Sequence, residues 1–190
     1  MHSLILFASG RGSNVQAIID FFKEKEVVKI ALIVCNNTLA GVLDIARQHD
    51  IPVLLVNKKD FLSPDFLKKL KACNPSLIAL AGFLWKIPEE VVHAFPGKII
   101  NIHPALLPKY GGKGMYGARV HEAVKAAGET ETGITIHFID EHYDKGSIIL
   151  QAFCPVCTAD TPEKIADNVH YLEHYYFPRA IEFLLGNKQF

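Results

Sequence analysis

The chain has 190 residues, of which 49% are apolar, enough to bury the core of one globular domain without disulfide or metal support. Its twenty basic and twenty acidic side chains give a formal net charge of zero, which argues against a broad surface for nucleic acid or an anionic membrane. No apolar run approaches the ~20 residues of a membrane-spanning helix and the four cysteines are scattered, so we expect a single cytoplasmic domain over residues 1–190.

Short apolar runs rich in β-formers recur along the first hundred residues and predict strands that are covered on both faces. They span residues 3–9, 29–35, 51–56, 76–82 and 98–103. Segments with helical spacing or helix start signals lie between them, at residues 14–25, 63–73 and 88–95. This alternation predicts an open, mostly parallel, Rossmann-like α/β sheet flanked by helices, with its ligand crevice at the carboxyl ends of the strands.

The second half of the chain begins with an expected helix over residues 118–129. Two strands follow, at 132–140 and 147–156, and the link "EHYDKG" between them is too short for a parallel crossover. We therefore expect an antiparallel strand pair near the C-terminus. A last long helix is expected to begin at Thr161 and to be kinked or broken near Pro178.

The first candidate site is the loop "ASGRGSN", which follows the first strand and opens the first helix. Backbone N–H groups and the positive helix end converge there, so an anion should bind. A dinucleotide fingerprint would need glycine where Val15 stands and an acid after the second strand, and both are missing. A single phosphate held by Gly12, Ser13 and Asn14 is the more economical interpretation; a tight turn capped by Ser13 or Asn14 is the alternative.

The second candidate site is the stretch "IINIHPALLP", residues 99–108. Asn101 and His103 are two apart in a strand, so their side chains point to the same face, and Pro104 ends the strand at the ligand edge. A lone histidine at a strand end is more often a structural residue. Asp144, in the turn between the last two strands, is a candidate proton-handling group if it lies near this pair, or otherwise a solvated turn acid.

Other chemistry-bearing residues favour structural roles. Cys154 and Cys157 are three apart on a predicted strand and have no second pair, which argues against a redox or zinc motif. His137 shares a face with Thr135 and either supports the site or belongs to the core or surface. Solvated or partly packed positions are expected for the histidines on predicted helices, His121, His170 and His174.

Four stretches carry a resemblance over almost the whole chain, in this order and spacing: "SGRGSN", "AGFLWKI", "NIHPALLPKY" and "GITIHFIDEHYDKG". They resemble the phosphoribosylglycinamide formyltransferases, folate-dependent enzymes of purine (IMP) biosynthesis. The resemblance implies direct transfer of a formyl group from 10-formyltetrahydrofolate, the co-substrate, to the amine of glycinamide ribonucleotide, without an acyl-enzyme or a metal. Related enzymes that act on other substrates add further domains, which we do not expect here. Partners should be small molecules, and the chain a monomer or homodimer.

The resemblance also implies roles for individual residues. The Asn101 amide and a protonated His103 would donate hydrogen bonds to the tetrahedral oxyanion, while Asp144 would favour the charged imidazole and relay the proton of the amine. The half of the chain up to about residue 100 would bind the phosphate, and the rest would bind the folate and hold the catalytic residues. The ribonucleotide would contact Gly12, Ser13, Asn14, His170 and Glu173. The folate would lie, mostly through backbone groups, against Leu84, Trp85, Lys86, Ile87, Asn101, Asp140, Glu141, His142, Tyr143 and Asp144.

The sequence departs from the family pattern in places that affect the folate contacts. Ala105 stands for a usual serine, Trp85 and Lys86 stand for an arginine and apolar pair, and Ser63 and Pro64 occupy a place where an arginine is common. Two alternatives therefore stay open: a formyltransferase for another amine, such as a sugar nucleotide, and a non-catalytic phosphosugar-binding module. A nicotinamide-dependent reductase is disfavoured by the incomplete dinucleotide fingerprint.

Overall fold

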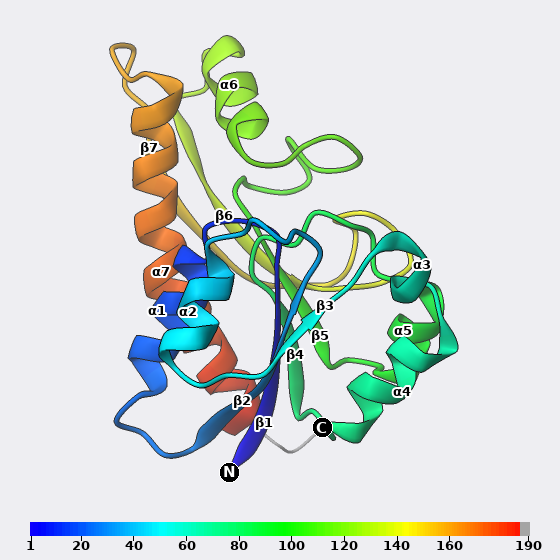
Figure 1. Ribbon diagram of the computed structural model, residues 1–190. Helices are drawn as coiled ribbons and strands as arrows, with labels where there is room; N and C mark the ends of the chain where they lie inside the picture. Colours follow the sequence, from blue (N-terminus) through cyan, green and yellow to red (C-terminus); the bar gives the residue numbers. More distant parts are fainter. Residues whose placement is uncertain (187–190) are drawn as a thin grey trace.

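The computed structural model describes residues 1–186 as a central sheet with helices on both faces (Figure 1). The sheet has seven strands in the order β3-β2-β1-β4-β5-β6-β7. Strands β1 to β5 pair in parallel, and β6 runs antiparallel to both of its neighbours. The strands are β1 His2–Ala8, β2 Val28–Cys35, β3 Val53–Leu55, β4 Leu77–Leu80, β5 Ile99–His103, β6 Glu131–Phe138 and β7 Ile148–Pro155. The helices are α1 Ser13–Phe22, α2 Val42–Gln48, α3 Lys58–Phe61, α4 Pro64–Ala72, α5 Glu89–Ala94, α6 Ala118–Ala126 and α7 Pro162–Gly186.

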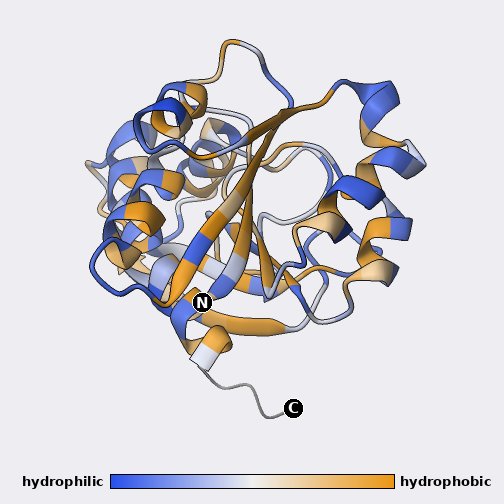
Figure 2. Cartoon of the chain, turned by 60° about the horizontal axis from the view of Figure 1, so that its bottom comes forward, coloured by the Kyte–Doolittle hydropathy of each residue, from blue (hydrophilic) through white to orange (hydrophobic). Residues whose placement is uncertain are grey.

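Alternate residues of the central strands feed two hydrophobic layers, as the period of two in a strand requires. On one face of the sheet, Leu4 and Leu6 of β1 pack with residues of α1 and α7. On the other face, Ile5 and Phe7 pack with residues of α3, α4 and α5. Figure 2 shows the result: hydrophobic residues predominate along the strands, and the helices carry both hydrophobic and hydrophilic residues.

The expected fold class is confirmed, with two differences in the sheet and the helices. The antiparallel part begins one strand earlier than expected, because β5 pairs antiparallel with β6 as well as β6 with β7. The two short helices α2 and α3 were not among the predicted elements. Helix α2 has no side-chain cap, so its sequence lacks that start signal, whereas Asn57 caps α3. No helix within residues 1–186 is both long and apolar enough to cross a membrane.

The last helix does not break at its proline. The sequence predicts a kink or a break near Pro178; helix α7 continues through Pro178 to Gly186, so there is no break. A proline removes one helical hydrogen bond, but Pro178 is buried next to Phe177, and Ile181 is also fully buried one turn further on. Packing of both turns in the core compensates for that loss. Glu173 lies before the proline in the same helix, and its contact with Asn14 places it at the amino-terminal end of α1.

The antiparallel register decides which side chains meet. Asn101 of β5 lies opposite His137 of β6, and His103 lies opposite Thr135. Because cross-strand partners in an antiparallel pair have adjacent side chains, this register places His137 beside Asn101 at the end of the central strand.

Candidate active site at the ends of β5 and β6

Three polar side chains from β5 and β6 converge on Asp144, in the turn between β6 and β7. The Nδ1 atom of His103 lies 3.8 Å from Asp144 Oδ2, and the Nε2 atom of His137 lies 3.6 Å from Asp144 Oδ1. The amide nitrogen of Asn101 lies 3.2 Å from His137 Nε2. The structure therefore brings Asn101, His103 and Asp144 together, and it adds His137 between two of them.

Backbone carbonyls fix the hydrogen positions on both imidazole rings, because a carbonyl oxygen only accepts a hydrogen bond. His103 Nε2 donates to the Tyr110 carbonyl over 2.8 Å, which leaves Nδ1 facing Asp144. His137 Nδ1 donates to the Phe138 carbonyl over 2.9 Å, so the Nε2 of a neutral ring accepts from the Asn101 amide. One hydrogen of that amide group is used, and the other can point at a substrate carbonyl.

The charges of the cluster follow from burial and these contacts. Burial would raise the pKa of Asp144, but the neighbouring His137 and His103 rings and a hydrogen bond from the Gly112 N–H hold it below its ordinary value. Burial lowers the pKa of His103 and outweighs the opposing effect of Asp144. An ionised Asp144 beside a neutral His103 is thus favoured near pH 7, although Asp144 itself acts in favour of the charged imidazole.

The glycine loop forms the amino-terminal end of α1. Gly12 has a φ of 85° at the N-cap position, and no side chain in residues 1–186 caps the helix. The alternative of a turn capped by Ser13 or Asn14 is therefore not what the structure has. A Cβ on Gly12 would lie 2.9 Å from side-chain atoms of Val42 and Ile45, so the packing of α2 also requires glycine here.

Asn14 joins this loop to the last helix. Its amide nitrogen donates to Glu173 Oε2 over 3.1 Å, and His170 Nε2 lies 4.0 Å from the same oxygen. The Oδ1 atom of Asn14 is buried without a partner among residues 1–186. Burial raises the pKa of Glu173, against the lowering effects of Asn14 and His170. Four of the expected ribonucleotide contacts, Ser13, Asn14, His170 and Glu173, thus lie at one place.

The stretch from Leu84 to Ile87 follows β4, which lies next to β1 in the sheet, so it begins beside the strand that precedes the glycine loop. The backbone N–H of Leu84 donates to Ser9 Oγ over 3.0 Å, which ties this stretch to the end of β1. Leu84 is exposed and Ile87 is buried, while Trp85 packs edge-on against Phe61. Lys86 forms an exposed ion pair with Glu89 of α5.

The turn between β6 and β7 faces the same side. Glu141 Oε1 lies 2.7 Å from His93 Nε2, so the turn is tied to α5. Asp140 Oδ1 accepts from the His142 backbone N–H over 2.7 Å, and Tyr143 is exposed. Apart from Asn101, the expected folate residues therefore lie on two segments: 84–87, which precedes α5, and 140–144, which contacts α5 through Glu141 and His93.

Several outcomes differ from the sequence-based expectations. His121 is buried, not solvated: burial, with the charges of His170 and His103, lowers its pKa to about 4. Cys157 lies beyond the end of β7 and is exposed, and all four cysteines are free thiols. His137 was weighed but not chosen; the period of two in its strand indicated its face, and only the β5–β6 pairing reveals its neighbour.

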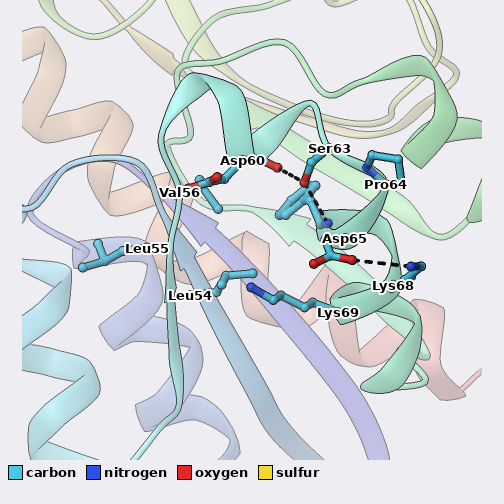
Figure 3. A pocket seen from close by; sticks show the side chains of 10 residues that line it. Leu54, Leu55, Val56, Asp60, Ser63, Pro64, Asp65, Lys68 and Lys69 are labelled. Carbon is cyan, nitrogen blue, oxygen red and sulfur yellow. Dashed lines mark hydrogen bonds and ion pairs between the residues drawn. The ribbon is translucent and has the colours of Figure 1, made fainter.

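A cavity of about 480 Å³ lies elsewhere, between β3 and the start of α4 at the far edge of the sheet (Figure 3). Ser63 and Pro64 line it, and Asp65 pairs with Lys68 over 3.5 Å at its mouth. Four strand positions separate β3 from β5 in the sheet, so this cavity is remote from Asn101. No residue expected to contact the ribonucleotide or the folate lines it.

Strand β5 ends in Asn-x-His, an acid lies in the turn after β6, and an uncapped glycine loop follows β1; together they offer a hydrogen-bond donor, proton-handling groups and an anion site, as a group-transfer enzyme needs. The comparison with protein families agrees: residues 2–181 match the family described as formyl transferase, and the chain belongs to that family.

Individual relatives narrow the comparison. The chain is 37% identical over 192 residues to a phosphoribosylglycinamide formyltransferase of Bacillus subtilis, covering 98% of this chain and 96% of that one. It is 42% identical to the chloroplastic phosphoribosylglycinamide formyltransferase of Vigna unguiculata, covering 95% of this chain. The chain spans 60% of the length of that plant relative and 63% of the one from Arabidopsis thaliana.

Solved structures give the same result. The crystal structure of phosphoribosylglycinamide formyltransferase from Anaplasma phagocytophilum superposes with a TM-score of 0.90 at 34% identity, covering 98% of this chain and 87% of that chain. The glycinamide ribonucleotide transformylase 1 of Geobacillus kaustophilus superposes with a TM-score of 0.89 at 35% identity, covering 98% of this chain and all of that one.

Proposed function

We propose that this chain transfers a formyl group from 10-formyltetrahydrofolate to the amine of N1-(5-phospho-D-ribosyl)glycinamide in purine biosynthesis. The observation that carries the proposal is that Asn101, His103 and Asp144 meet beside the end of β5. His103 lies within 4 Å of Asp144, and His137 lies within 4 Å of both Asp144 and Asn101. The names and high coverage of the bacterial relatives support the choice of acceptor.

The reaction begins with attack of the acceptor amine on the formyl carbon, which moves the carbonyl electron pair onto oxygen. The free amide hydrogen of Asn101 donates to that oxyanion from a rigid strand end, where a preorganised donor contributes most. The nitrogen that attacks becomes an ammonium and must lose a proton before the folate nitrogen can leave.

His103 and Asp144 handle that proton. With Nε2–H held by the Tyr110 carbonyl, neutral His103 presents a basic Nδ1 to the site. Protonation at Nδ1 produces the charged donor that stabilises the oxyanion, and the carboxylate of Asp144 stabilises the imidazolium. The proton then passes to the departing folate nitrogen, directly or through water, as the carbon–nitrogen bond breaks. Every group begins and ends the cycle in the same protonation state.

The amino-terminal end of α1 is the proposed phosphate site. The backbone N–H groups of Ser13 and Asn14 lie in the first turn of a helix that no side chain within residues 1–186 caps, so they are available to an anion. His170 lies beside Glu173 and supplies a ring nitrogen that can donate a hydrogen bond. Glu173 accepts a hydrogen bond from Asn14 and can also accept hydrogen bonds from ribose hydroxyls.

The folate is proposed to lie between segments 84–87 and 140–144, with the reactive formyl group at Asn101. Among the departures from the family pattern, Lys86 and Pro64 are exposed, Trp85 and Ser63 are half-buried and Ala105 is buried, while Leu84 is anchored through its backbone. Recognition through backbone groups tolerates such exchanges. We further propose a cytoplasmic location, which fits four free thiols, and a monomer or homodimer.

The proposal is tested by mixing the protein with glycinamide ribonucleotide and a 10-formylfolate and by following deformylation of the folate optically. We expect a change that depends on the acceptor and that disappears in the Asn101→Ala variant. An amino sugar nucleotide in place of glycinamide ribonucleotide tests the alternative acceptor. Binding of the ribonucleotide without any turnover would instead support the non-catalytic phosphosugar module.

A further inference from the structure

The loop that follows β5 holds two groups of the proposed active site through its backbone. The Tyr110 carbonyl accepts from His103 Nε2 over 2.8 Å, and the Gly112 N–H donates to Asp144 Oδ2 over 2.8 Å. These two loop positions are only two residues apart. A displacement of this loop would therefore change the orientation of the imidazole and of the carboxylate together.

The loop backbone is tightly constrained at this point. Tyr110 has a φ of 55°, in the left-handed region that non-glycine residues rarely adopt. A Cβ on Gly111 would come within 2.5 Å of Leu107 Cδ2 and within 3.4 Å of Asp144 Cβ. Such a conformation persists only where surrounding contacts hold it, so the side chain of Tyr110 must be anchored.

The anchor is Glu129, which follows α6. The Tyr110 hydroxyl donates to Glu129 Oε1 over 2.9 Å, and Lys109 Nζ lies 2.8 Å and 3.2 Å from the two carboxylate oxygens. The backbone N–H of Glu129 donates to the Val124 carbonyl over 3.3 Å, which ties this residue to the helix. Hydrogen bonds from Lys109 and Tyr110 lower the pKa of Glu129, so its carboxylate is ionised at neutral pH.

We propose that Tyr110 and Glu129 are positioning residues: their hydroxyl–carboxylate bond fixes the Tyr110 carbonyl, which keeps the hydrogen of His103 on Nε2 and turns Nδ1 toward Asp144. Within residues 1–186, neither side chain forms a hydrogen bond or ion pair with His103 or Asp144, so the effect passes through the loop backbone. The kinetic part of the proposal rests on the proposed formyl transfer; the structural part, the state of His103, does not.

The experiment compares four variants. Tyr110→Phe and Glu129→Ala each remove the anchoring bond, whereas Glu129→Gln keeps an oxygen that accepts from the hydroxyl. Lys109→Ala is the matched control, because it removes an exposed cation of the same cluster and leaves the hydroxyl–carboxylate bond in place. Thermal melts of all four identify any variant that fails to fold.

We expect Tyr110→Phe and Glu129→Ala each to lower kcat about 5- to 20-fold with KM for both substrates unchanged, since small misplacements of reacting groups are costly. The double variant should be no worse than either single one, because both break the same bond. Glu129→Gln should recover most of the activity, and Lys109→Ala should stay within about twofold of the wild type.

Nitrogen NMR of His103 provides the readout that a general loss of stability would not move. The unsubstituted protein should show the proton on Nε2, and Tyr110→Phe should populate the Nδ1–H form. Unchanged His103 signals in both anchor variants overturn the proposal, whether or not kcat falls; additive kcat losses, or losses confined to KM, also overturn it. If the unsubstituted protein transfers no formyl group, the proposed function fails while the NMR comparison still decides the role of Tyr110 and Glu129.

Discussion

The two ends of the proposed acceptor site are built in opposite ways. At the chemical end, Asn101, His103, His137 and Asp144 are already linked by hydrogen bonds and short contacts to each other and to fixed backbone groups. At the phosphate end, α1 begins without a side-chain cap and Asn14 Oδ1 is buried without a partner among residues 1–186. Preorganised donors stabilise a transition state, whereas unsatisfied groups gain most from a ligand. The first end is built for rate and the second for binding.

The largest effect expected is on the chemical end, from Asp144→Asn. The amide keeps the shape of the carboxylate but cannot accept the proton or stabilise a charged His103, so kcat should fall roughly 10²- to 10⁴-fold. Steady-state kinetics over a pH range measure this. Activity near the wild-type value with the same pH profile would assign Asp144 a structural role.

The next effect in size is that of Asn101→Ala. Loss of one oxyanion donor should lower kcat about 10²- to 10³-fold, with little change in ribonucleotide affinity. Because Asn101 also donates to His137, a His137→Ala variant separates the two roles: it leaves the amide in place and should cost less. A titration of ribonucleotide binding completes the comparison, and a normal turnover number for Asn101→Ala would contradict the oxyanion role.

The contrast between the two ends was only partly accessible from the sequence. The period of two in β5 placed Asn101 and His103 on one face, and the glycine loop before α1 indicated an anion site. The neighbour of Asn101 could not be derived, because β5 and β6 are far apart in the sequence and local hydrophobic patterns do not determine the order of strands in a sheet. His137 was therefore left undecided.

Other parts of the site leave no sequence signal at all. A carbonyl contact such as that from Tyr110 to His103 depends on the backbone position, which any residue type can supply. The short helix α2 has no side-chain cap and was not predicted, although it is the reason that Gly12 tolerates no side chain. The expected break at Pro178 failed because tertiary packing of Phe177 and Ile181 outweighs one lost hydrogen bond.

The phosphate end is tested by comparing glycinamide ribonucleotide with its dephosphorylated riboside. Charge-assisted hydrogen bonds contribute roughly 1.5 to 3 kcal/mol each, so loss of the phosphate should raise KM by at least about 10-fold with a smaller effect on kcat. Asn14→Ala should reduce this preference for the phosphorylated acceptor and leave the riboside almost unaffected. Equal reaction of both acceptors with the unsubstituted protein would show that the loop is only a turn.

The last effect expected is on stability rather than on activity, and it comes from a buried histidine between the two ends. His121 lies in α6, its ring centroid is 6.4 Å from that of His170, and the charges of both His170 and His103 act on it. Burial is the main reason that its pKa is lowered, from 6.5 in an exposed ring to about 4 in the folded chain. Between these two pH values the unfolded chain binds the proton and the folded chain does not. Stability therefore rises with pH across this window and is lost as the pH falls through it.

A shift of this size corresponds to as much as roughly 3 kcal/mol of unfolding free energy between pH 6.5 and pH 4. Urea unfolding at several pH values measures it in the unsubstituted protein and in His121→Asn, which cannot titrate. The variant should be less stable near pH 7, because the asparagine fills less of the buried site, and its stability should depend less steeply on pH below 6.5. His142→Asn is the matched control, since that ring lies in an exposed turn and should leave the slope unchanged. Equal slopes in His121→Asn and the unsubstituted protein would mean that other groups carry the acid sensitivity, and that the region between the two ends tolerates a charge.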